Sequence, residues 1–82
     1  MERGLLFHAR RPADLEDEQW GRFIVEATLW PVPEEGCQLE PTVWLLPKHP
    51  PAYSGLQMLC HQFEVGFYYL EVSYPRGWQK LP

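Results

Sequence analysis

The chain has 82 residues, enough for one domain and too few for two. Its formal net charge of −4 repels phosphate backbones and argues against direct nucleic-acid binding. The N-terminus has an apolar run of only three residues, far short of a signal peptide, and no stretch approaches the roughly 20 apolar residues of a membrane helix. We therefore expect a soluble cytoplasmic protein with reduced thiols and no membrane partner.

The charge is distributed unevenly along the chain. Residues 1–13 carry a balance of +2, residues 14–40 a balance of −7 and residues 41–82 a balance of +1. The acidic middle segment contains eight acids against Arg22 alone. Opposite charges steer protein association, so this segment favours a partner with a basic surface.

The first elements expected are an edge strand and a short helix. Residues 4–9 are short and apolar at their centre, which is typical of an edge strand. A helix is predicted over residues 12–20, because Pro12 suits a first helical turn and Asp14 is a good N-cap. The acids at 16–18 lie where the helix dipole favours negative charge.

Two periodicities compete over residues 20–30. A helix would place apolar residues such as Phe23, Ala27 and Trp30 on one stripe, whereas alternation would suit a strand. Gly21 costs a helix interior about 1 kcal/mol, and the segment is rich in residues that sheets favour. We predict a strand over 22–30, paired with a strand at 40–46 through a loose turn at 31–36.

The richest apolar segment covers residues 57–74. Its alternation predicts strands at 57–65 and 67–74 in the middle of the sheet, with Gly66 marking a bulge, bend or tight turn. Residues 47–55 are predicted to be a loop. The chain as a whole is expected to be one small α+β domain spanning residues 1–82, mostly antiparallel sheet with one short N-terminal helix.

The residues able to support catalysis or bind a metal are few. The residues of the types that bind zinc are Cys37, Cys60, His8, His49 and His61, but no pair of them has the sequence spacing of a zinc site. The same residues could form a nucleophilic cysteine and its base, which requires the fold to bring a distant histidine to Cys60. No phosphate-binding loop or hydrolase motif occurs, so neither an enzyme nor a cofactor is predicted.

The favoured hypothesis is a non-enzymatic protein-binding module, an inhibitor or adaptor that docks on a larger, basic, nucleic-acid-handling protein. Small phage-encoded inhibitors have this general character, and the comparison is one of type only. Acidic side chains and exposed aromatic rings are the groups expected to contact such a partner. The predicted contact residues are Asp14, Glu16, Asp17, Glu18, Glu34, Glu35, Trp30, Trp44, Tyr53 and Trp78.

Two alternatives stay open from the sequence. The second hypothesis is a small accessory subunit of a bacterial enzyme complex that forms a homodimer through a sheet edge. The third is an enzyme that acts through Cys60 and a histidine. It also remains open that the acids bind no partner and form a solvated surface that keeps an aromatic-rich protein soluble.

Overall fold

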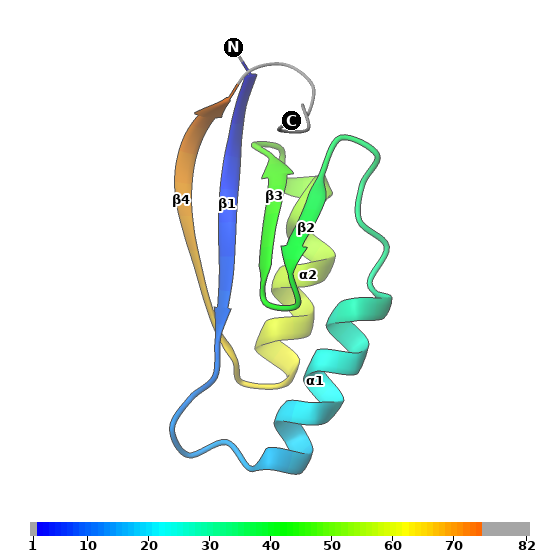
Figure 1. Cartoon of the computed structure of the whole chain (residues 1–82), viewed down its shortest axis with the longest axis vertical. Coiled ribbons are helices and arrows are strands. Elements are labelled where there is room, and N and C mark those ends of the chain that lie inside the picture. The colour runs from blue at the N-terminus through cyan, green and yellow to red at the C-terminus, as the bar shows by residue number, and fades with distance from the viewer. Residues whose placement is uncertain (1, 75–82) are drawn as a thin grey trace, which may run out of the picture.

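Four strands and two helices alternate in the order βαββαβ over residues 2–74, the part of the chain that the computed structural model describes (Figure 1). Each helix connects two strands, and β2 and β3 form the one hairpin of this region. The elements are β1 (Glu2–Arg10), α1 (Asp17–Leu29), β2 (Cys37–Glu40), β3 (Val43–Pro47), α2 (Pro50–Gln62) and β4 (Gly66–Tyr74).

The sheet has the strand order β2-β3-β1-β4, and every neighbouring pair is antiparallel. Strand β1 is central, and it pairs with β4 over nine residues, from Glu2 opposite Tyr74 to Arg10 opposite Gly66. This succession and strand order define the ferredoxin-like arrangement of two interleaved βαβ units. The α+β class is therefore confirmed, with two helices instead of one.

Both helices pack on one face of the sheet (Figure 1). Alternate residues of β1, namely Leu5, Phe7 and Ala9, are buried under the helices, while Leu6 and His8 lie on the open face. Burial of apolar area contributes about 25 cal/mol per Å², so this layer supplies most of the stability. The core cluster is Leu5, Phe7, Ala9, Phe23, Ala27, Trp44, Leu46, Leu56, Cys60 and Val65.

The segment at 17–29 is helical, so the predicted strand at 22–30 and its hairpin with 40–46 are wrong, and the helix predicted at 12–20 begins later. Phe23 and Ala27 are one helical turn apart, and both are fully buried. Gly21 lies on the exposed side of the helix, with no side chain of another element within 4 Å of the position that a Cβ would take. The burial of Phe23 and Ala27 offsets the loss of about 1 kcal/mol in helix stability that a glycine causes.

Residues 50–62 form a helix where a loop and a strand at 57–65 were predicted, and that prediction is also wrong. Two prolines occupy the first helical positions, where their missing N–H groups cost nothing. Leu56 and Cys60 are buried one turn apart, as a helix requires. The period of two in this segment was coincidental, because the buried set follows the helical period.

Helix α2 ends in a Schellman motif, which takes the place of the turn predicted at Gly66. The N–H of Val65 donates to the Cys60 carbonyl at 2.8 Å, and that of Glu64 donates to the His61 carbonyl at 3.1 Å. Glu64 has the left-handed backbone that this motif needs, with φ of 58°. Gly66 is then the first residue of β4.

The strands predicted at 4–9 and 67–74 are confirmed, but their places in the sheet are exchanged. The first, expected at an edge, is central β1, and the second, expected in the middle, is edge strand β4. The predicted strand at 40–46 is divided between β2 and β3. Neither helix within residues 2–74 is long and apolar enough to cross a membrane.

Candidate protein-binding surfaces

The acids of residues 14–40 lie along one side of the molecule. Helix α1 and the loops at its two ends form the border of the fold opposite β4 (Figure 1). The six predicted acidic contact residues are all exposed, four of them at or just before the start of α1 and two in the loop that follows it. A helix of 13 residues is about 20 Å long, so the two groups are well separated.

Only part of this negative charge is neutralised nearby. Asp17 forms an ion pair with Arg11, whose guanidinium also donates to the Leu15 carbonyl at 2.9 Å. Asp17 and Glu18 lie in the first turn of α1, where the helix dipole stabilises carboxylates. For Glu34 and Glu35 the structure over residues 2–74 records no ion pair. This side is therefore a strongly negative, solvent-exposed surface.

The predicted aromatic contacts lie elsewhere. Trp44 is 0% exposed in the core, so the expectation that it is available to a partner is wrong. Trp30 is half-buried at the C-terminal end of α1, and its indole nitrogen lies against Gly55 of α2. Tyr53 is half-buried with its ring centroid 4.9 Å from that of Phe7. Trp78 lies outside the described residues.

The exposed large hydrophobic residues that sequence reasoning missed as contact residues are on β4. Tyr68, Tyr69 and Leu70 are consecutive, and they are 53%, 69% and 63% exposed. Tyr69 pairs with buried Phe7 and so lies on the helix-covered face, whereas Leu70 pairs with Leu6 on the open face. Both faces of β4 are therefore apolar and exposed. The sequence showed that both faces of this strand are apolar, but its position at the edge of the sheet comes from the structure.

Charged groups near β4 are paired with one another. Lys48 Nζ donates to both carboxylate oxygens of Glu71 at 3.1 Å, and Arg3 lies 3.7 Å from the same carboxylate. The guanidinium of Arg10 lies 4.9 Å from the ring centroid of Tyr68, within cation–π range. The two sides of the molecule thus differ, with an acidic border at α1 and an apolar border at β4, where the Glu71 carboxylate is paired with Lys48 and Arg3.

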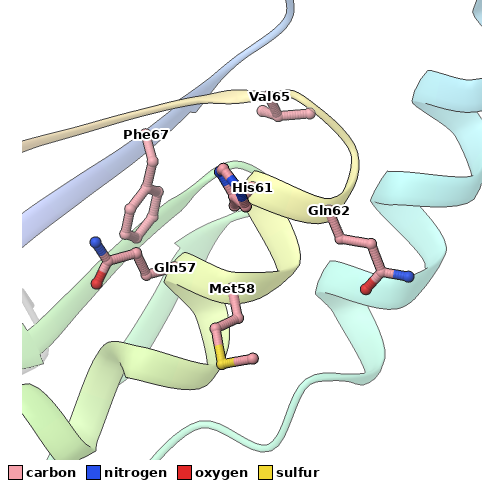
Figure 2. Close-up of a pocket in the computed structure, with 6 residues that line it drawn as sticks. All are labelled: Gln57, Met58, His61, Gln62, Val65 and Phe67. Atoms are coloured by element: carbon pink, nitrogen blue, oxygen red, sulfur yellow. The ribbon is translucent and has the colours of Figure 1, made fainter.

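A groove separates α2 from β4. One hollow of about 570 Å³ adjoins a second of about 370 Å³, and the two share Gln57 and Phe67 in their walls. Figure 2 shows Phe67 and Gln57 facing one another across the first hollow, while Gln62 points toward α1. Its lining consists of Gln57, Met58, His61, Gln62, Val65 and Phe67. His61 is the one ionisable residue in this lining.

The candidate nucleophile and metal ligands do not assemble into a site. Cys60 is fully buried in the core, and burial raises the pKa of its thiol to about 12. An activated thiol needs the opposite, a lowered pKa and partial exposure. Within residues 2–74, no three His, Cys, Asp or Glu side chains are grouped closely enough to hold a metal ion.

No protein-family model, curated protein or solved structure matches this chain. The fold and its surfaces therefore define the protein by class alone: a small α+β protein with a ferredoxin-like strand order, an acidic helical border and an exposed apolar edge strand.

Proposed function

We propose that this protein is a non-enzymatic protein-binding module, an inhibitor or adaptor whose acidic border docks on a larger basic protein that handles nucleic acid. The observation that supports this most is the segregation of charge. Seven of the eight acids of the 14–40 segment are exposed on α1 and its flanking loops, against the two cations Arg11 and Arg22, while Arg3 and Lys48 lie near β4. A border with a large excess of negative charge attracts a basic surface and speeds association with it.

The state of Cys60 supports a binding role over the alternative of a Cys/His enzyme. A thiol that is buried and has a raised pKa is a poor nucleophile at neutral pH. His61 is exposed on the outer side of α2, whereas Cys60 faces the core, so the two adjacent residues do not form a pair. The groove in Figure 2 offers an apolar wall and one imidazole, and a single ionisable group does not make an acid–base pair.

The test is affinity capture with the full-length tagged protein from lysate of its source organism or that organism's host, after nuclease treatment. The test variant is Glu34→Lys/Glu35→Lys. Both side chains are exposed in the loop after α1, so replacing them leaves the helices intact. The matched control is Ser54→Lys/Gln57→Lys/Glu64→Lys, three exposed positions on or after α2. Both variants change the net charge equally, since Glu→Lys counts two and the other changes count one.

We expect the wild-type protein and the control variant to retain a basic protein at low salt and to release it as salt screens the charges. The loop variant should lose at least about tenfold in affinity, equivalent to about 1.4 kcal/mol. Equal capture by the loop variant and the wild type, or capture that salt does not weaken, would reject the acidic border as the docking surface.

A further inference from the structure

The outer edge of β4 presents free backbone hydrogen-bonding groups. The N–H of Ala9 donates to the Thr42 carbonyl at 2.9 Å, so Ala9 directs its backbone groups away from β4. In an antiparallel ladder the direction of the backbone N–H and C=O groups alternates from one residue to the next. The residues of β4 opposite Ala9, Phe7, Leu5 and Arg3 therefore direct these backbone groups away from β1, toward the outer edge. The outward-facing residues are Phe67, Tyr69, Glu71 and Ser73. No other strand of residues 2–74 pairs with this edge.

This edge lacks the features that normally prevent strand addition. It runs for nine residues in unbroken register with β1, and it contains neither Pro nor Lys. Its one charged residue, Glu71, is bound by Lys48 and Arg3. The opposite edge, β2, is protected, because it has four residues, a register shift between Gln38 and Glu40, and a proline directly after it. The β2 edge is therefore protected against the addition of another strand, and the β4 edge is not.

We propose that β4 pairs antiparallel with β4 of a second copy of this chain, about a two-fold axis at Leu70. The pairing joins two four-stranded sheets into one continuous sheet. Leu70 is the central residue of β4, so this register uses the whole strand. The outward-facing residues then pair as Phe67 with Ser73 and Tyr69 with Glu71 of the second copy, and each pair exchanges two backbone hydrogen bonds.

The strand is self-complementary in this register, which identifies a second copy as the occupant. On the open face, Leu70 meets the partner's Leu70, and Tyr68 meets the partner's Val72, an aromatic and β-branched pair that stabilises sheets. Glu71 meets the partner's Tyr69, so the two carboxylates are not opposite one another. Moving the axis by one residue to Glu71 would place them face to face, where like charges destabilise. Pairing in the proposed register covers the three exposed residues Tyr68, Tyr69 and Leu70.

Dimerisation at β4 is compatible with the acidic border, because α1 and β4 lie at opposite borders of the fold (Figure 1). The acidic surfaces of the two copies would face outward, at the far ends of the joined sheet, with little mutual repulsion beyond a Debye length of about 8 Å. The dimer does not depend on the proposed function, and a variant at either border leaves the other unchanged.

The first test is the mass of the full-length protein in solution, by light scattering and sedimentation, from low to several hundred micromolar. We expect a dimer that dissociates on dilution. Leu70→Lys should convert it to a monomer, because two ammonium groups would face each other across the axis. The control is Leu29→Lys on α1, which carries the same change at a residue that is 72% exposed, against 63% for Leu70. Circular dichroism should show both variants folded.

The second test fixes the register by cross-linking, in a Cys37→Ser background that leaves buried Cys60 in place. In Leu70→Cys the two cysteines would be a non-hydrogen-bonded pair with Cα atoms about 4.5 Å apart, within the range of a disulfide. In Tyr68→Cys they would be about 14 Å apart along the strands, too far to bridge. Under mild oxidation we expect at least tenfold more covalent dimer from the first variant.

Three outcomes would overturn the proposal. A wild-type protein that is monomeric at every concentration would show that the edge is free or is covered in another way, for example by residues 75–82 or by the strand of another protein. A dimer that survives Leu70→Lys would place the interface elsewhere. Equal cross-linking of the two cysteine variants would reject the axis at Leu70. Capture of a basic partner through the acidic border would be unaffected by any of these results.

Discussion

Replacing Glu64 with glycine should stabilise the protein. Glu64 occupies the left-handed position that ends α2, with φ of 58°. A non-glycine residue pays about 1–2 kcal/mol for this conformation, whereas glycine adopts it freely. Glycine also raises the conformational entropy of the unfolded chain, which costs about 0.4–1 kcal/mol. The difference predicts a gain of about 1 kcal/mol in the free energy of unfolding.

The side chain of Glu64 is exposed, and no hydrogen bond or ion pair holds it within residues 2–74. Its removal should therefore add little cost of its own. The flanking contacts of the Schellman motif, from Val65 to Cys60 and from Glu64 to His61, are made by the backbone and persist in the variant. For a domain of this size, 1 kcal/mol corresponds to a rise in Tm of about 4–8 °C.

The assay is thermal and urea unfolding followed by circular dichroism, at one protein concentration throughout. Two controls separate the backbone effect from the loss of the side chain. Glu64→Ala removes the carboxylate but keeps the left-handed strain, and it should change Tm little. Gln57→Gly places glycine at an exposed interior position of α2, and it should lower stability by about 1 kcal/mol. A Glu64→Gly protein no more stable than Glu64→Ala would refute the strain argument.

The other predictions concern α1 and the core. Gly21→Ala should raise the free energy of unfolding by about 1 kcal/mol, because the added methyl group meets no atom within 4 Å and alanine favours a helix interior; a loss of stability by urea unfolding would contradict this. Cys60 should react with iodoacetamide at pH 8 at least about 100-fold more slowly in the native protein than in urea, as read by mass spectrometry, and rapid native labelling would show that the thiol is accessible. The pKa of the Cys60 thiol is 9.0 in the unfolded chain and about 12 in the folded protein. The stabilisation that comes from the neutral thiol is therefore complete below pH 9 and is lost as the pH rises toward 12. Cys60→Ala should remove this alkaline step from a plot of stability against pH, while lowering stability at pH 7.

Some features of the sites could be predicted from the sequence because they depend on solvation alone. The acids at 14–18 and at Glu34 and Glu35 are exposed as expected, since a charge buried without a partner is strongly unfavourable. Trp44 shows where this reasoning ends. An aromatic ring is stable either in a core or at a contact surface, and only the position of β3 under the helices decided that it is buried.

Local sequence determined the elements whose pattern fits a single structure. The strands at β1 and β4 were predicted because their aromatic and aliphatic residues suit a sheet. The acids at 14–18 indicated a helix in this region, although it begins at Asp17 and not at residue 12. Residues 22–30 and 57–65 fitted both periods. Their outcome depended on which side chains could reach a common core, and Phe23, Ala27, Leu56 and Cys60 meet there as two packed helices.

The place of each strand in the sheet was also decided by tertiary structure. Strand β4 is the more aromatic of the two long strands, and hydrophobicity alone would put it at the centre. Each of the two βαβ crossovers instead skips one strand, so β3 lies between β1 and β2, and β1 lies between β3 and β4. The sequence by itself determined what β4 is made of. The chain topology determined that its apolar faces and outer backbone groups lie at an edge.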